Sequence, residues 1–284
     1  MKEALIRQVL LPSDIRIGGG AILQTGSVLQ KLGLINPLIV TDKTLIELGH
    51  VTTLTTILDQ NKISWSLFDK VIEDPTDECL LAGLEFFSSG SFDCVIGFGG
   101  GSSMDVAKAI SAMSVNIGHV REYKPPAELK KCGLPIILLP TTGGTGAECT
   151  KWAVITDSAS NEKYNLSGPA FVAKAAVIDW KLTLTKPARL TADTAVDSLT
   201  HAIEAFVSRK ASAFTDTLAL SAMQLIANNV LNAFADPENC TAREALMLGA
   251  SQAGIAFSNA SVALVHGMNR PIGANFHVSP WFIK

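Results

Sequence analysis

Three residues in the last third of the sequence have the side chains and the spacing of a metal site. Asp197 and His201 are four residues apart, so a helix through them presents a carboxylate and an imidazole on one face. His266 follows in the apolar setting of Val265-His266-Gly267-Met268. Such ligands suit Fe(II), Zn(II) or Mn(II), and three of them leave a position open for catalysis. The same spacing also occurs in surface ion pairs, and a lone buried histidine is often a satisfied core residue, so both alternatives stay open.

A glycine-rich segment offers a second kind of chemistry. An apolar run from Val95 to Phe98 ends in Gly99-Gly100-Gly101-Ser102-Ser103, and a helical stretch follows. This order predicts a strand, a turn and a helix. Glycines let the backbone approach a ligand closely, and the N–H groups at the start of the helix face an anion such as a nucleotide pyrophosphate. The segment lacks the spaced G-x-G-x-x-G pattern, and a plain tight turn is the alternative.

A second polar rim follows the next apolar run. Residues 135–140 read as a buried strand and lead into Thr141-Thr142-Gly143-Gly144-Thr145. A threonine and glycine loop is commonly only a loop. Two such rims at the carboxyl ends of consecutive parallel strands nevertheless converge on one crevice, which favours a ligand site there.

Two charged residues have open interpretations. Asp42 follows the apolar strand predicted at 37–41, where a carboxylate accepts hydrogen bonds from ribose hydroxyls and repels an added 2′-phosphate. Asp42 is an equally good cap for a helix that starts near Lys43. Lys163 has an ammonium that reaches a ribose or phosphate in one interpretation and is simply solvated in the other.

The elements that must position these residues change character along the chain. After an extended entry and a turn at residues 12–21, a helix is expected over 23–32. Apolar strand signals recur near 37–42, 66–69, 95–98, 135–140, 153–156 and 175–179, with a helix after Pro75. From about Pro187 onward the apolar residues recur at helical spacing. We therefore expect an α/β domain over residues 1–185 and an all-helical domain over 186–284.

Composition narrows the class of protein. The 284 residues are 48% apolar with a net charge of −3, which supports a large core and argues against nucleic acid as a partner. Five scattered cysteines give no C-x-x-C pair, so neither a disulfide framework nor a cysteine metal site is expected. The charged start argues against a signal peptide, and no stretch is expected to be apolar enough to span a bilayer. We expect a cytoplasmic protein without a membrane partner.

Taken together, these motifs resemble the iron-containing (group III) alcohol dehydrogenase family over almost the whole chain. The resemblance rests on four ordered segments: 99–108, 140–148, 197–204 and 265–268. It implies an N-terminal Rossmann-like parallel-sheet domain that binds NAD, with NADP the less favoured cofactor. It also implies a C-terminal helical domain that holds one divalent metal, Fe(II) or Zn(II), and a homo-oligomer, expected to be a dimer.

The resemblance also implies roles for single residues. Asp197, His201 and His266 match three of the family's metal ligands and form the expected catalytic centre. Asp42 matches the family's NAD-favouring acid. The other expected cofactor-binding residues are Gly99, Gly100, Gly101, Ser102, Thr141, Thr142, Thr145 and Lys163.

The sequence departs from the family pattern near its end. The family's fourth ligand, a histidine, aligns with Pro280, which cannot coordinate a metal; His277 is a second-rank candidate for that role. Family members continue through several more helices beyond the position of Lys284, so the chain resembles a truncated or frame-shifted member with an incomplete helical domain. Weak metal binding and low turnover are therefore expected.

The resemblance predicts a metal-dependent oxidoreductase that transfers hydride between a small alcohol, aldehyde or ketone and NAD(P). One alternative is a non-catalytic nucleotide-binding remnant. Another is a polyol-phosphate or sugar-phosphate enzyme of the related fold, which the lack of an evident basic cluster near the predicted ligands disfavours.

Overall fold

A computed structural model describes residues 6–125, 127, 129 and 131–276 of the chain. Its centre is a six-stranded parallel sheet in the order β1-β8-β5-β4-β2-β3. The strands are β1 (Asp14–Ile17), β2 (Pro37–Val40), β3 (Ser66–Phe68), β4 (Cys94–Gly99), β5 (Ile136–Pro140) and β8 (Ala175–Ile178). The apolar runs of the sequence form these strands because both faces of a parallel sheet are covered by helices.

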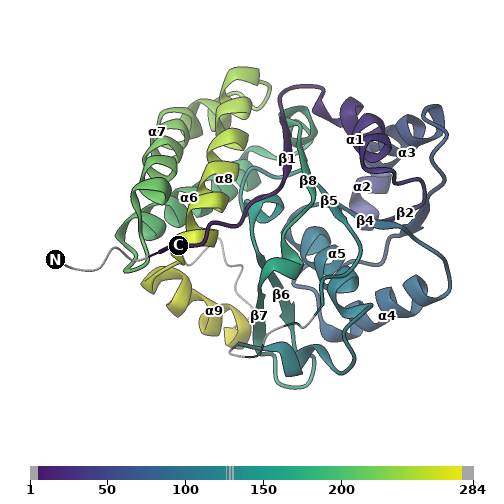
Figure 1. The fold of residues 1–284 in the computed structure, drawn as a ribbon. Helices are drawn as coiled ribbons and strands as arrows, with labels where there is room; N and C mark the ends of the chain where they lie inside the picture. The colour runs from purple at the N-terminus through teal and green to yellow at the C-terminus, as the bar shows by residue number, and fades with distance from the viewer. Residues whose placement is uncertain (1–5, 126, 128, 130, 277–284) are drawn as a thin grey trace.

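Helices cover both faces of the sheet (Figure 1). They are α1 (Thr25–Leu32), α2 (Lys43–Glu47), α3 (His50–Gln60), α4 (Asp77–Ser88) and α5 (Gly101–Met113). Alternate strand residues supply two separate cores: Val95 and Leu138 pack with α4 and α5, whereas Ile96 and Ile137 pack on the opposite face with α1 and α3. The helix predicted after Pro75 begins at Asp77, and the Thr76 side chain caps it.

The second half of the described chain is helical. It comprises α6 (Ala188–Val207), α7 (Ala213–Ala235), α8 (Cys240–Ala260) and α9 (Leu264–Phe276). In Figure 1, α6, α7 and α8 lie side by side in one lobe, and α9 contacts α6. The predicted fold class, a Rossmann-like parallel sheet followed by helices, is confirmed.

One predicted strand lies outside the parallel sheet. Residues 152–156 form β6 (Trp152–Thr156), which pairs antiparallel with β7 (Lys163–Ser167) in a separate hairpin. No strand was expected at β7. Its signal is a strict alternation in which Tyr164 and Leu166 are buried between partly exposed Lys163, Asn165 and Ser167.

The composition of α7 differs from expectation. This helix of 23 residues contains a window of mean hydropathy 1.3, so by length and composition it meets the criterion for a membrane span. The expectation that no stretch reaches that composition was wrong. Within the fold, α7 packs against α6 and α8 through Ala222, Ile226 and Ala233. The two alanines allow close approach of these helices.

Candidate active site

A cavity of about 1000 Å³ opens between the sheet and the helical lobe. The sheet side contributes the glycine turn and the threonine loop, and the helical side contributes Asp197, His201 and His266. The carboxyl ends of β4 and β5 lie next to each other because these strands are paired in the sheet. The two polar rims predicted from the sequence therefore do meet at one crevice, as expected at this edge of a parallel sheet.

The glycine turn connects β4 to α5 and lines the cavity. Gly99 has a φ of 148°, a conformation that favours glycine, and Gly100 is the residue before the helix. Because Gly100 has no side chain to cap α5, the first N–H groups of this 13-residue helix stay available to an anion. A Cβ at Gly101 would lie 2.9 Å from Cγ2 of Thr145, so the turn has no room for a side chain there. These features fit a nucleotide pyrophosphate.

The threonine loop after β5 divides into buried and cavity-facing residues. The Thr141 N–H donates to the Gly99 carbonyl at 2.9 Å, which joins the two rims. Thr141 is fully buried and does not belong to the cavity lining, in contrast to Thr142 and Thr145. Direct cofactor contact is therefore better supported for Thr142 and Thr145 than for Thr141.

Asp42 and Lys163 both line the cavity but have partners of their own. The Asp42 side chain caps α2 by accepting the Leu45 N–H at 3.2 Å, and it also accepts the Ser103 hydroxyl at 3.3 Å. The capping interpretation is thus confirmed, and a ribose contact stays a prediction. The Lys163 ammonium pairs with Asp74 at 2.6 Å, so a phosphate contact would have to share this lysine with a carboxylate.

A buried lysine fixes the loop that carries the threonine rim. Lys108 is a residue of α5 and is fully buried. Its ammonium donates to the carbonyls of Ala147, Thr150 and Trp152 at 2.6, 3.1 and 2.8 Å. Burial lowers the pKa of Lys108 to about 8, despite the opposing charge of Asp105. Lys108 therefore ties α5 to the segment that leads from the threonine rim into β6.

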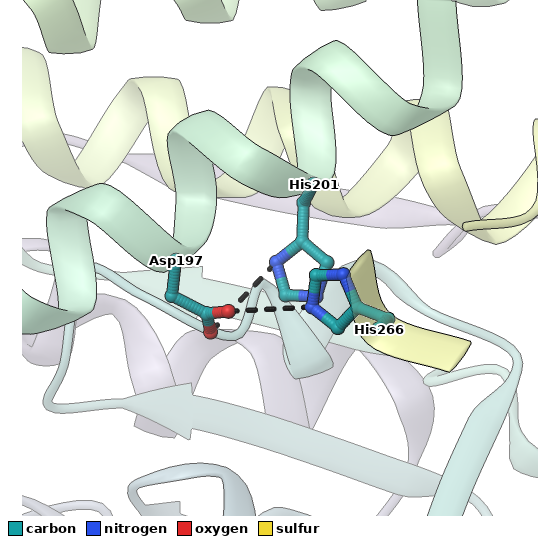
Figure 2. Close-up of side chains that lie close together, drawn as sticks. All are labelled: Asp197, His201 and His266. Atoms are coloured by element: carbon teal, nitrogen blue, oxygen red, sulfur yellow. Dashed lines mark ion pairs between the residues drawn. The ribbon is translucent and has the colours of Figure 1, made fainter. Parts of the chain in front are cut away.

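The three predicted metal ligands converge on one point of the cavity wall (Figure 2). Asp197 and His201 descend from one face of α6, and His266 comes from the first turn of α9. Nε2 of His266 is 3.3 Å from Oδ1 of Asp197, and Nδ1 of His201 is 3.8 Å from Oδ2 of Asp197. All three ligand atoms lie within 4.8 Å of one another. Ligands that share one metal at 2.0–2.2 Å are separated by roughly 3 to 4 Å, so the set is close to a coordinating arrangement.

The surroundings of His201 favour metal coordination. The ring is stacked between Phe257 and His266, each at a centroid distance of 4.2 Å. Burial, reinforced by the nearby His266, lowers the pKa of His201 well below its ordinary value, so the ring is neutral as a ligand must be. Among the described residues, Nδ1 of His201 is buried and has no hydrogen-bond partner. A buried acceptor beside a carboxylate and a second imidazole fits a divalent metal.

Two residues with a part in this site received no role from the sequence. Phe257 of α8 covers one face of His201, and no motif or spacing indicates it. Glu204 contacts His266 through its carboxylate. A signal for Glu204 does exist, since residues 197, 201 and 204 follow the i, i+4, i+7 spacing of one helix face. His277 and Pro280, the positions considered for a fourth ligand, lie outside the described residues.

Comparisons with known proteins agree on one family. Residues 12–180 match the family described as iron-containing alcohol dehydrogenase, and residues 191–280 match the C-terminal part of the Fe-containing alcohol dehydrogenase family. The chain is 37% identical to long-chain-alcohol dehydrogenase 1 of Geobacillus thermodenitrificans, over 96% of this chain and 70% of that protein. It is 36% identical to NAD-dependent methanol dehydrogenase of Bacillus methanolicus, over 93% of this chain and 69% of that protein.

A solved structure shows the same fold. The sulfoacetaldehyde reductase of Bifidobacterium kashiwanohense, crystallised in complex with NAD+, superposes with a TM-score of 0.92 at 28% identity. The match covers 99% of this chain and 74% of that one.

Proposed function

The chain belongs to the iron-containing alcohol dehydrogenase family, and from this premise we propose that it exchanges hydride between a small alcohol and NAD at one divalent metal held by Asp197, His201 and His266. Family membership makes it a metal-dependent oxidoreductase. The observation that carries the proposal is the meeting of two features in one cavity: the uncapped start of α5 and the three convergent ligands.

Each side of the cavity has a separate task in this proposal. When bound, the metal supplies Lewis acidity at the substrate oxygen and NAD supplies the hydride acceptor. The first N–H groups of α5 bind the pyrophosphate, and Thr145 packs against the same turn. Phe257 lines the cavity and stacks on His201, so its ring shields that ligand from water. Asp197 places a negative charge between two imidazoles and thereby favours a cation.

The identity of the metal is the finer part of the proposal. One carboxylate and two imidazoles suit Fe(II), Zn(II) and Mn(II) alike. The family description names iron, which supports Fe(II) with Zn(II) as the alternative. Reconstitution of metal-free protein with each metal under anaerobic conditions separates them, since the native metal gives the highest turnover at equal occupancy.

NAD is favoured over NADP by Asp42 and by two relatives. The carboxylate lines the cavity and would repel a 2′-phosphate. One relative is named as NAD-dependent, and one similar structure contains NAD+. In the Asp42→Asn variant we expect the ratio of the NADPH and NADH dissociation constants to fall, as measured by nicotinamide fluorescence. An unchanged ratio contradicts the role given to Asp42.

The decisive experiment measures NADH production by reconstituted protein on small primary alcohols, diols and phosphorylated polyols. Four lysines line the cavity, so phosphorylated substrates are a necessary part of the panel; they are Lys43, Lys70, Lys163 and Lys186. We expect metal-dependent oxidation of unphosphorylated alcohols. A preference for phosphorylated polyols overturns the substrate class. NADH binding without metal-dependent turnover on any substrate overturns the catalytic proposal.

The expected weakness of the metal site has its own test. Three of the described residues could hold the metal, and the family resemblance aligns Pro280 with the histidine that is the fourth ligand. We expect Pro280→His to tighten zinc binding by at least about tenfold, which corresponds to about 1.4 kcal/mol. Pro280→Ala is the matched control. Equal zinc affinity of both variants contradicts the assignment of Pro280 to the fourth position.

A further inference from the structure

Glu204 joins the two helices that carry the metal ligands. It lies one turn after His201 on α6 and is buried, with 3% of its surface exposed. Its Oε1 accepts the backbone N–H groups of Val265 and His266 at 2.7 and 3.3 Å, and its Oε2 contacts Nδ1 of His266. All three of these contacts are therefore made to the first turn of α9, where His266 lies.

The backbone contacts determine where α9 begins. The first N–H groups of a helix have no partner within that helix, and a carboxylate there satisfies them and interacts favourably with the helix dipole. Glu204 provides this carboxylate from another helix. It therefore holds the backbone of His266 against α6, the helix that presents Asp197 and His201.

The contact to Nδ1 determines which nitrogen of His266 carries the proton. A carboxylate only accepts hydrogen bonds, so the ring nitrogen that faces it donates. Nε2 faces the cluster in Figure 2, 3.3 Å from Oδ1 of Asp197. In the metal-loaded site Nε2 must present a lone pair to the metal, so the ring proton then stays on Nδ1. We propose that Glu204 is the positioning residue of the metal site, which caps α9 and keeps His266 in the tautomer whose Nε2 binds the metal. This inference rests on the metal site of the proposed function.

The test uses zinc-loaded protein labelled with ¹⁵N-histidine and two-bond ¹⁵N–¹H NMR, together with zinc titration calorimetry. In the wild type we expect His266 to carry its proton on Nδ1 and to bind zinc through Nε2. In Glu204→Gln the amide oxygen preserves the cap, but the amide NH₂ faces Nδ1 and favours the opposite tautomer. Zinc affinity should then fall about 10- to 100-fold.

Glu148→Gln is the matched control. Glu148 is also buried, and its carboxylate accepts the hydroxyl of Ser251 on α8, a helix of the helical lobe. Glu148 is not part of the ligand cluster. We expect Glu148→Gln to keep the zinc affinity of the wild type and the Nδ1–H tautomer of His266. Loss of affinity in Glu204→Gln alone therefore supports a role at His266 rather than a general effect on folding.

Three results overturn the inference. The first is that the Glu204→Gln variant keeps both the zinc affinity and the His266 tautomer of the wild type. Another is an equal loss of affinity in both variants. The third is a zinc-loaded wild type in which His266 has its proton on Nε2, a result that needs no variant to fold. If the wild type binds no zinc, the proposed function itself fails, and the two failures are thereby distinguished.

Discussion

At the scale of single residues, Asp197 is the centre of the site. Its two oxygens face the two imidazoles, Oδ1 toward His266 and Oδ2 toward His201. Its side chain is buried, so its negative charge acts in a medium of low dielectric. A cation between these three groups would offset the cost of burying that charge, which is the physical argument for the proposed metal.

Asp197→Asn removes the charge and keeps the shape. We expect zinc affinity to fall by more than the roughly 10- to 100-fold change typical of losing an outer partner of a ligand. Turnover should fall with it. Calorimetric titration of the metal-free variant provides the measurement. Asp193→Asn is the control for the change of charge, because the half-buried Asp193 lies on the same helix and pairs with Arg189 outside the ligand cluster. Equal zinc affinity of the two variants contradicts the ligand role of Asp197.

Lys108 gives a prediction about pH. Its pKa is about 8 in the folded protein and 10.5 in the unfolded chain, so the unfolded chain binds more protons between these values. Keeping Lys108 protonated therefore lowers the free energy of unfolding at pH values below about 8. This cost decreases as pH rises through the window, because the lysine becomes neutral. Urea denaturation of wild type and Lys108→Met at pH values across the window measures the difference between them. The free energy of unfolding of the wild type should increase relative to that of Lys108→Met as pH rises. A difference that is constant with pH contradicts the lowered pKa of Lys108.

The sequence predicts single residues where spacing carries geometric information. Asp197 and His201 share a helix face because four residues complete about one turn, so their proximity could be predicted. The approach of His266 depends on how α9 packs against α6, which spacing along the chain does not encode. The same limit explains Phe257, which reaches His201 from α8.

At the scale of elements, the start of α5 is the part of the fold that would bind the cofactor in the proposed function. A strand that ends in glycines brings backbone N–H groups to the cavity, and the buried lysine of α5 ties down the following loop. The order of β4, the glycine turn and α5 could be predicted, because an apolar run and a group of glycines are visible in the local sequence. The β6–β7 hairpin could not be placed, because pairing outside the main sheet depends on tertiary contacts.

Gly101→Ala tests the glycine turn. A Cβ would lie 2.9 Å from Cγ2 of Thr145, so either the Thr145 side chain or the turn must shift. We expect NADH affinity to fall about tenfold, or about 1.4 kcal/mol, as measured by fluorescence titration. In a double-mutant cycle, Thr145→Ser removes the Cγ2 methyl and should recover part of the loss.

The matched control for this cycle is Gly143→Ala in the threonine loop. A Cβ there meets its nearest atoms at 3.5 Å, which is an ordinary contact. NADH affinity should stay within twofold of the wild type, a difference of about 0.4 kcal/mol. If Gly101→Ala also keeps NADH affinity within twofold of the wild type, close packing at Gly101 is not required for cofactor binding.

At the scale of the whole molecule, the site depends on how the two lobes are joined. The cavity lies between them, and the segment from β8 to α6 connects them. Arg243 of α8 is buried and donates to the carbonyls of Thr183 and Lys186 on this segment and to the Thr191 hydroxyl of α6. One guanidinium therefore links the connection to both helices.

Arg243→Met should destabilise the junction. The substitution leaves several buried acceptors without a donor, and we expect a loss of at least about 2 kcal/mol in the free energy of unfolding. Urea denaturation measures it, and Arg209→Met at an exposed position of the same lobe is the control. A loss no larger than that of the control contradicts the linking role.

The change from an α/β half to a helical half could be predicted for the whole chain, because the apolar period changes near Pro187. The crevice between the halves could be predicted only on the sheet side, where parallel strands end together. Its helical wall is formed by packing of α6, α8 and α9, so it became visible only in three dimensions.

The central claim is that Asp197, His201 and His266 together hold one divalent metal beside the start of α5. Anomalous diffraction at the zinc edge, from crystals of the zinc-loaded protein, tests it most directly. The account predicts one strong peak in contact with Oδ of Asp197, Nε2 of His266 and a ring nitrogen of His201. A zinc-loaded crystal whose anomalous peaks all lie away from these three side chains would contradict it.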